Sequence, residues 1–294
     1  MTRKPETKRL DAAVAQTASI SRERAQALIM AGKVLVNGNP ITKAGASVPD
    51  GAHIEISDDT RFASRGGEKL ERALDAFEWP VKGLRCLDVG ASTGGFTDCL
   101  LQRGAASVTA IDVGYGQLAW SLQNDPRVTV VDRTNFRHVE LEALGAPFDF
   151  ITIDVSFISL TKLSDQLRSA ASDGTRIIAL VKPQFEAGRA AVGRGGVVRD
   201  ASEHVNAIES VMAAFDRVGL APAQLTFSPI TGPAGNIEFL LGAIATGRNN
   251  TKPGSGRASA RPETTSQALA DGGVAARKID VAGVVAAAHE TLGR

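Results

Sequence analysis

The chain has 294 residues, 43% of them hydrophobic and 22% charged, so it is long enough for more than one domain and apolar enough for a sizeable core. Its 33 basic and 32 acidic side chains leave a net charge of +1, so a surface that attracts a polyanion must be local. Two cysteines exclude a disulfide framework, and four scattered histidines give no metal-ligand spacing, so we expect no metal. No apolar signal core and no apolar run of about 18 residues is present, so we expect no membrane span and a cytoplasmic protein.

Composition divides the chain into parts. Residues 1–60 are rich in basic and turn-forming residues and predict a small α+β domain, followed by a linker at 61–67. Residues 68–246 alternate strand-like and helix-like stretches. Residues 247–278 combine glycine and proline with almost no large apolar side chain, so we expect this tail to be disordered. Residues 279–294 place apolar side chains at helical spacing and predict a short C-terminal helix.

The first domain has clear start and stop signals. Ser21 is expected to cap a helix that ends at Gly32. Strands are expected at 34–36 and at 54–56, with a tight hairpin signal at Asn37-Gly38. Residues 1–33 hold seven Lys or Arg against three Asp or Glu, which is typical of a face that contacts RNA phosphates, or of a merely solvated helix face.

The string SRxxAxxLIxxGxVxVNG, which begins at Ser21, resembles the alpha-L RNA-binding motif, and the resemblance covers most of residues 8–57. It implies that the basic residues around this helix bind RNA. These candidates are Lys8, Arg9, Arg22, Arg24 and Lys33.

The middle of the chain has the rhythm of a mostly parallel sheet with helices on both faces, a Rossmann-like α/β fold. Ligands of such sheets bind at the carboxyl ends of the strands. The expected strands are 85–89, 107–112, 128–131, 148–154, 175–181, 225–229 and 237–244, and the expected helices are 68–77, 95–103, 159–171 and 201–218.

A glycine-rich turn follows the first of these strands in the string DVGASTGGF. Gly90 allows a sharp turn, and Gly94 and Gly95 leave room for a ligand near the backbone. The spacing differs from a dinucleotide fingerprint, and Asp88 would repel a pyrophosphate but suits a sulfonium. The turn therefore favours S-adenosylmethionine over NAD, although glycine-rich turns are also common without a ligand. The candidate cofactor residues of the turn are Asp88, Gly90, Ala91, Ser92, Thr93, Gly94, Gly95 and Phe96.

Three further aspartates stand at the ends of the next strands. Asp112 is placed to accept ribose hydroxyls, and Asp132 to accept from an adenine amino group. Asp154 ends the fourth strand. For each one alone the alternative is an ordinary cap or turn residue. Together they predict one cofactor crevice.

Lys182 ends an apolar strand, where burial disfavours its charged form and a neighbouring carboxylate favours it. We interpret it as a candidate general base; the alternative is a lysine that extends to solvent. Glu238 is flanked by apolar residues and should be paired, whereas Lys69 near a helix start reads as an exposed helix lysine.

In order and context, Lys69, Asp154, Lys182 and Glu238 resemble the catalytic tetrad of the FtsJ/RrmJ-like ribose 2′-O-methyltransferases. With the alpha-L motif ahead of it, the chain is similar to the TlyA family, often called haemolysin A. The resemblance implies methylation of ribosomal RNA, on cytidine in several members, with ribosomal subunits as partners. It also implies that Lys182 takes the 2′-hydroxyl proton while Asp154 orients it, and that the target base leaves its stack.

Two further segments are candidates for RNA contact. The loop at 183–199 carries Arg189 and Arg194 and reads as an RNA-gathering lid or as a plain surface loop, and Arg65 in the linker could transmit RNA docking. The alternatives to a methyltransferase are a membrane-active cytolysin, a non-catalytic RNA-binding scaffold and a nicotinamide oxidoreductase. The sequence leaves the target nucleotide and the oligomeric state open.

Overall fold

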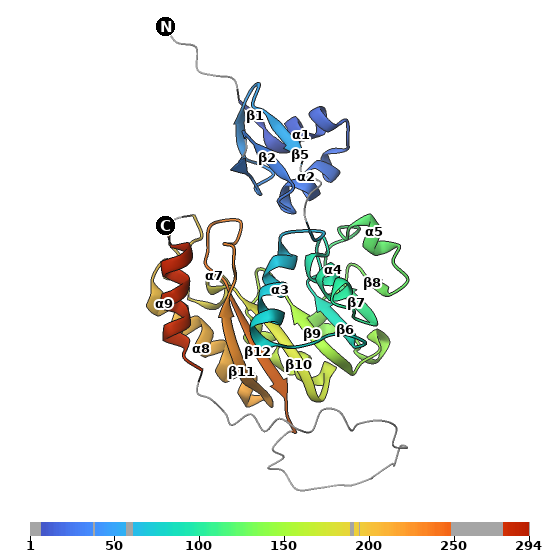
Figure 1. Ribbon diagram of the computed structural model, residues 1–294, viewed down its shortest axis with the longest axis vertical. Helices are drawn as coiled ribbons and strands as arrows, with labels where there is room; N and C mark the ends of the chain where they lie inside the picture. The colour runs from blue at the N-terminus through green and yellow to red at the C-terminus, as the bar shows by residue number, and fades with distance from the viewer. Residues whose placement is uncertain are drawn as a thin grey trace.

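The computed structural model describes residues 7–37, 39–56, 61–188, 191–193, 195–247 and 279–293. The N-terminal part forms a small domain above a larger sheet-containing domain, and the chain enters the larger one at residues 61–65 (Figure 1). Arg189, Arg194 and all of the predicted disordered tail except Gly247 lie outside the described residues.

The small domain packs two helices against short antiparallel strands. Ser21 caps the second helix by accepting a hydrogen bond from the Arg24 amide, as predicted, and Gly32 follows that helix with a φ of +75°. A core of seven buried apolar residues, including Leu10 and Ile29, holds the layers together. The elements are β1 (Thr7–Arg9), α1 (Leu10–Ala18), α2 (Arg22–Met30), β2 (Val34–Val36), β3 (Asn39–Pro40), β4 (Ser47–Pro49) and β5 (Ile54–Ile56); β2 pairs with β3 and β5, and β1 with β4.

The large domain is built on a seven-stranded sheet in the order β11-β12-β10-β9-β6-β7-β8. The pairing from β10 through β9, β6 and β7 to β8 is parallel, and β12 runs antiparallel to both its neighbours. The predicted Rossmann-like fold is therefore confirmed, with one reversed strand. The strands are β6 (Arg85–Val89), β7 (Ser107–Ile111), β8 (Val128–Val131), β9 (Phe148–Ile153), β10 (Ala171–Val181), β11 (Leu220–Phe227) and β12 (Phe239–Ala245).

Helices cover both faces of this sheet (Figure 1). Successive side chains of β10 alternate between two buried clusters: Ile177 and Ala179 join the one under α6, α8 and α9, and Ile178 and Leu180 join the one under α3 and α4. The helices are α3 (Gly66–Phe77), α4 (Gly95–Gln102), α5 (Trp120–Gln123), α6 (Ser164–Ala170), α7 (Pro183–Glu186), α8 (Ala201–Arg217) and α9 (Val281–Leu292), with 3₁₀ turns η1 (Phe136–His138), η2 (Glu142–Leu144) and η3 (Leu160–Lys162).

Two predicted boundaries are wrong for identifiable reasons. The helix expected over 159–171 is divided into η3 and α6, because the Ser159 hydroxyl caps η3 by accepting from the Thr161 amide. The last residue of that prediction, Ala171, already starts β10. The strand expected from residue 225 begins at Leu220, because the whole segment pairs with β12 apart from a bulge after Pro222.

The predicted C-terminal helix is α9, which packs against α8 and β11 (Figure 1, red). Its apolar stripe of Val281, Val285 and Ala288 is buried in the core. His289 of α9 contacts the fully buried His204 of α8, with 2.9 Å between Nε2 of His289 and Nδ1 of His204. The helix is thus an integral part of the large domain.

Candidate active site

Four charged residues from distant parts of the sequence meet at the carboxyl ends of the parallel strands. Lys69 lies in the first turns of α3, Asp154 follows β9, Lys182 follows β10, and Glu238 directly precedes β12. The register explains part of the meeting, since Val181 pairs with Phe239 across the antiparallel β10–β12 ladder. Lys182 and Glu238 are therefore next to each other at the same end of the sheet.

The four charges form two ion pairs. Lys182 Nζ lies 2.5 Å from Asp154 Oδ1, and Lys69 Nζ lies 2.5 Å from Glu238 Oε2. Lys182 also donates to the Ser156 hydroxyl at 3.0 Å. The Lys69–Glu238 pair is buried, whereas Asp154 keeps 23% of its side chain exposed. The Lys182–Asp154 pair is thus the more exposed of the two.

Electrostatics couples the two pairs. Burial alone would raise the pKa of Asp154, but the charges of Lys182 and Lys69 outweigh it and hold that pKa below its ordinary value. Burial alone would lower the pKa of Lys182, but the carboxylates of Asp154 and Glu238 raise it above its ordinary value. In the free protein Lys182 is therefore an ammonium ion, which corrects the prediction of a lysine poised to give up its proton.

The glycine-rich turn adjoins this cluster. A side chain at Gly90 would collide with the backbone carbonyl of Asp154, and Gly90 has a φ of +84°, so the position suits only glycine. The Asp154 amide in turn donates to the Val89 carbonyl at 2.9 Å. The turn is therefore in direct contact with the tetrad residue Asp154 at the ends of β6 and β9.

The structure corrects the reason given for the other two glycines. A side chain at Gly94 would collide with Leu118 and Leu122, and one at Gly95 would collide with Ser64. These glycines make room for protein neighbours and not for a ligand. Ala91 and Phe96 are also buried in the core, so Ser92 and Thr93, with Gly90, are the residues from 90 to 96 that reach the surface.

Asp88 is fully buried and cannot contact a sulfonium directly, contrary to the prediction. Its carboxylate accepts hydrogen bonds from Thr97 Oγ1 at 2.6 Å and from Thr152 Oγ1 at 2.9 Å. Burial raises the pKa of Asp88 to about 6, even though both hydroxyls lower it. Asp88 therefore connects β6 to α4 and β9 by hydrogen bonds in the buried core.

Asp112 and Asp132 lie at the ends of β7 and β8, where both remain half-exposed. Asp112 accepts from the amides of Ser92 and Gly114, and Asp132 accepts from the amide of Gly116. Both aspartates thus hold the glycine-rich turn and the segment after β7, and each keeps oxygen lone pairs for a ligand. Two carboxylate acceptors around a half-open turn fit the hydroxyls and the amino group of an adenosine, which donate.

The predicted RNA-contacting residues of the first domain are not equivalent. Arg9 and Arg22 both bind the buried carboxylate of Asp11, with N–O distances of 2.8 and 3.1 Å, and Lys8 pairs with Asp50. By contrast, Arg24 is exposed and Lys33 half-exposed, and neither makes an ion pair within the described residues. Arg65 lies with its side chain against Gly32, where it joins the linker to the small domain.

Sequence reasoning missed Phe157, which lies three residues after Asp154 and is 91% exposed. It has a φ of +66°, an uncommon conformation for an aromatic residue, and its ring lies 5.2 Å from that of Phe185. Phe185 likewise follows Lys182 by three residues, so each ring lies close along the chain to one member of the Lys182–Asp154 pair. The string SFIS carries no periodic signal that would have distinguished Phe157 from a core residue.

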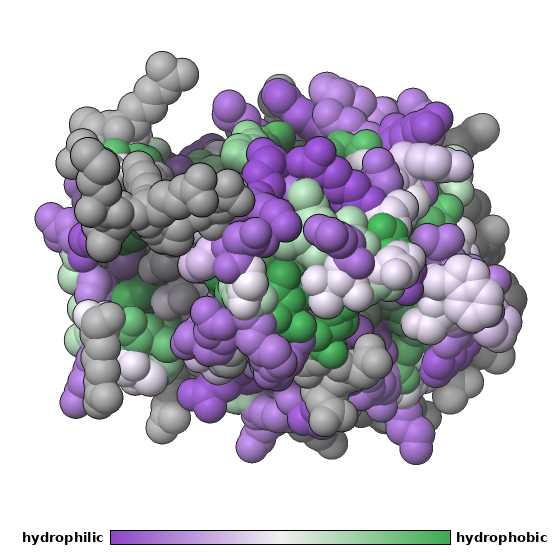
Figure 2. Space-filling view, turned by 90° about the horizontal axis from the view of Figure 1, so that it is seen from above, coloured by the Kyte–Doolittle hydropathy of each residue, from purple (hydrophilic) through white to green (hydrophobic). Residues whose placement is uncertain are grey.

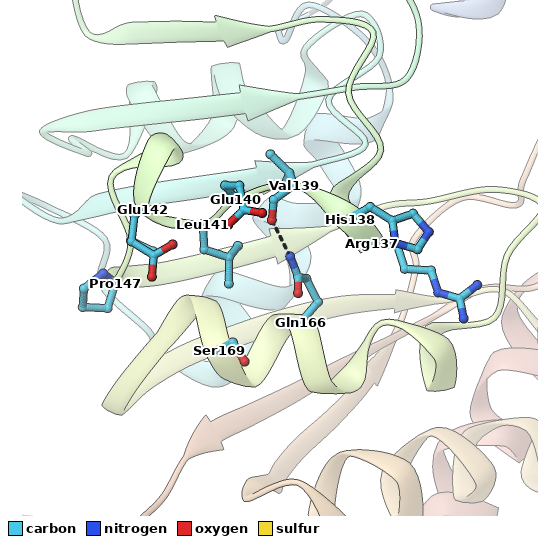
Figure 3. A pocket seen from close by; sticks show the side chains of 10 residues that line it. Arg137, His138, Val139, Glu140, Leu141, Glu142, Pro147, Gln166 and Ser169 are labelled. Atoms are coloured by element: carbon cyan, nitrogen blue, oxygen red, sulfur yellow. Dashed lines mark hydrogen bonds between the residues drawn. The ribbon is translucent and has the colours of Figure 1, made fainter.

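A separate cavity of about 410 Å³ lies beside α6 (Figure 3). Gln166 projects from α6 and donates to the Val139 carbonyl at its wall. The cavity shares no residue with the tetrad or the glycine-rich turn. Over the described residues, no group of three His, Cys, Asp or Glu side chains is arranged to hold a metal ion, and no helix is long and apolar enough to cross a membrane.

Comparisons with known proteins agree with this geometry. Residues 62–244 match the FtsJ-like methyltransferase family, and residues 8–54 match the S4 domain. The 16S/23S rRNA (cytidine-2′-O)-methyltransferase TlyA of Mycobacterium tuberculosis is 48% identical over 223 residues, which cover 75% of this chain and 83% of that protein. Hemolysin A of Brachyspira hyodysenteriae is 40% identical, over 75% of this chain and 92% of that protein.

A solved structure from Streptococcus thermophilus, described as a candidate hemolysin, superposes with a TM-score of 0.70 at 37% identity and covers 98% of both chains. Its coverage includes the small domain and the sheet together. The chain belongs to the FtsJ-like methyltransferase family and carries an N-terminal S4 domain.

Proposed function

We propose that this protein transfers the methyl group of S-adenosylmethionine to the ribose 2′ oxygen of a cytidine in ribosomal RNA. The observation that carries the proposal is the coupled pair of ion pairs, Lys182–Asp154 and Lys69–Glu238, beside the glycine-rich turn. The printed activity of the M. tuberculosis relative supports the same substrate. In this proposal residues 1–60 dock the RNA, residues 68–246 carry the reaction, and the partners are ribosomal subunits in the cytoplasm.

The residues that would hold the donor are Asp112 and Asp132 on its adenosine, Ser92 and Thr93 of the turn, and Asp154 toward its charged end. S-adenosylmethionine supplies a methyl group on a positively charged sulfur that leaves as a neutral thioether. Lys182 accepts the proton of the 2′-hydroxyl while that oxygen forms its bond to the methyl carbon. The buried Lys69–Glu238 pair keeps Lys182 and the hydroxyl in place.

The raised pKa of Lys182 sets a condition on this step, because an ammonium ion cannot accept a proton. A second positive charge beside Asp154 lowers the pKa of a neighbouring lysine and competes for the same carboxylate. We therefore expect Lys182 to become a base only in the protein with its donor bound. Phe157, exposed beside the pair, offers a face on which the target base stacks after leaving its helix.

The test uses purified protein, S-adenosylmethionine and ribosomal subunits from cells that lack this enzyme. Mapping of 2′-O-methyl groups on both ribosomal RNAs is expected to show new modification at cytidine on one or both subunits. Methyl groups on a base, or no transfer to subunits or free ribosomal RNA, would overturn the proposal.

A further inference from the structure

A groove of about 560 Å³ lies between the two domains. One wall comes from α2 and the residues that follow it, including Arg24, Leu28 and Lys33. The other wall comes from Thr93 and the segment 116–121, with Trp120 at the start of α5. Because Thr93 also belongs to the glycine-rich turn, the groove borders that turn. Seen from above, the side of the molecule that carries the small domain is mostly hydrophilic and has a smaller hydrophobic area (Figure 2).

Trp120 presents an aromatic face to this groove. It is 71% exposed, and its ring makes no aromatic or cation–π contact among the described residues. Its neighbours Leu118 and Leu122 are buried against Gly94, and its carbonyl accepts from Asn124, so the backbone that carries the indole is fixed. A large, exposed indole on a fixed backbone is typical of a binding surface.

The opposite wall supplies positive charge. Arg24 and Lys33 make no ion pair in the described part of the chain, whereas Arg9 and Arg22 are bound to Asp11. Glu23 is the one acidic residue in the lining, and hydrogen bonds from its own amide and from Ser21 hold its carboxylate at the start of α2. The groove therefore combines two available cations with one available aromatic ring.

We propose that this groove binds a single-stranded segment of the substrate RNA, with a base stacked on Trp120 and the backbone phosphates against Arg24 and Lys33. Phosphate-binding cations beside a stacking ring are the elements of single-strand recognition. S-adenosylmethionine has an adenine ring but no phosphate for the cationic wall, so the groove fits RNA better than the donor. The inference rests on the proposed function and assigns part of the RNA path to the methyltransferase domain.

The experiment uses fluorescence, because the chain has only two tryptophans and the other, Trp79, is buried. In a Trp79→Phe variant, Trp120 is the sole reporter; if that variant does not fold, the difference between wild type and Trp120→Phe gives the same signal. Titration with a single-stranded RNA of about 10 nucleotides is expected to quench Trp120 emission to saturation. The same strand annealed into a duplex is expected to quench it much less.

Substitutions then separate stacking from charge. Trp120→Ala is expected to weaken binding of this RNA about tenfold, and Trp120→Phe to keep part of the affinity. Arg24→Ala and Lys33→Ala are expected to weaken it and to flatten its salt dependence. Lys82→Ala, which removes one charge before β6 at the other end of the sheet, is the matched control and should change little. Affinity for S-adenosylmethionine, measured by calorimetry, should be the same in all these variants.

Unchanged RNA affinity in Trp120→Ala, or quenching by S-adenosylmethionine and not by RNA, would overturn the inference. The two proposals fail separately. If Trp120 binds the RNA but ribosomal subunits receive no methyl group, the proposed function fails. If methylation proceeds and Trp120→Ala leaves the KM for ribosomal RNA unchanged, the groove is not part of the RNA path.

Discussion

The two domains each contain a fully buried aspartate, in opposite surroundings. In the S4 domain, the guanidinium groups of Arg9 and Arg22 donate to Asp11, and these bonds hold its pKa well below the usual range. In the methyltransferase domain, Asp88 has two neutral threonine hydroxyls as partners, and burial raises its pKa to about 6. An aspartate without exposed area is thus a secure anion in one domain and a costly one in the other.

A cation within hydrogen-bond distance, which Asp11 has and Asp88 lacks, keeps a carboxylate without exposed area ionised. The tetrad follows the pattern of Asp11, because each of its carboxylates has a lysine 2.5 Å away. Its charges are therefore held in place in the free protein, ready to be redistributed when a further charge arrives. Asp88 lies in the same domain but serves the packing of β6, α4 and β9.

The largest loss of activity is expected at Lys182, which both forms an ion pair and is the proposed general base. Lys182→Ala should reduce kcat for methyl transfer by about 10³-fold, since general-base catalysis contributes about 10²–10⁴. Lys182→Arg separates the two roles of the residue, because arginine keeps the ion pair with Asp154 but does not deprotonate. We expect the arginine variant to be as inactive as the alanine variant while both still bind S-adenosylmethionine.

Single-turnover transfer of a labelled methyl group to ribosomal subunits measures this rate. Near wild-type activity in Lys182→Arg would show that the charge, and not proton transfer, is what the reaction needs. A pH profile adds a second readout, since the rate should rise with pH as Lys182 loses its proton in the donor-bound protein, and the arginine variant should lack that rise.

Asp88→Asn is expected to stabilise the protein at neutral pH. The pKa of Asp88 rises from 3.8 unfolded to about 6 folded, so ionised Asp88 costs the native state on the order of 3 kcal/mol above pH 6. The native state binds the proton more tightly, so this cost is absent below about pH 4 and grows as pH rises through about 6. Denaturant unfolding of both proteins at several pH values should show that the difference in their free energies of unfolding disappears in acid. A difference in free energy of unfolding that does not change with pH would contradict this role of Asp88.

Asp11→Asn, in contrast to Asp88→Asn, is expected to destabilise the S4 domain, because Arg9 and Arg22 lose their shared anion. Amide hydrogen exchange in α1 and α2 should become faster, while exchange in the large domain stays the same. Asp50→Asn is the matched control, since Asp50 pairs with Lys8 at the surface and its loss should change exchange less. Equal protection in wild type and Asp11→Asn would show that the buried pairing is dispensable.

Much of this arrangement follows from local sequence. Apolar runs located every strand of the sheet and placed Asp154 and Lys182 at strand ends, and parallel strands bring their carboxyl ends to one edge. The pairing of these two residues was implied by the family resemblance. The partnership of Lys69 with Glu238 was implied by the family resemblance alone. The two residues are 169 positions apart, and no local pattern links them.

What local sequence could not give was the environment of each charge. Nothing near Asp88 in the chain says that Thr152 of a neighbouring strand covers it, or that Arg9 is bound to Asp11 and so not available to RNA. The balance of burial and pairing at Lys182 likewise depends on Glu238, brought next to it by β12. Exposure is similarly non-local, which is why the exposed rings of Phe157 and Trp120 were missed.

The smallest change in stability is expected at the histidine pair that joins α8 and α9. His204 Nε2 lies 3.1 Å from the Val198 carbonyl and must donate to it, so its neutral Nδ1 accepts from His289 Nε2. Burial lowers the pKa of His204 below its ordinary 6.5, so the unfolded chain binds its proton first as the pH falls. Stability should therefore decrease as the pH falls below about 6.5, the opposite sign to Asp88.

Because Asp88 and His204 titrate with opposite signs in overlapping pH ranges, the histidine effect has to be measured in the Asp88→Asn background. There, denaturant unfolding should show a loss of stability as the pH falls below about 6.5. Adding His204→Gln, which keeps a donor toward Val198 but does not titrate, should remove most of that slope. Asp200 caps α8 and its charge raises the pKa of His204, so Asp200→Asn should steepen the loss by removing the anion that favours the protonated form of His204 in the native state. A slope that survives His204→Gln would assign the acid sensitivity to another group.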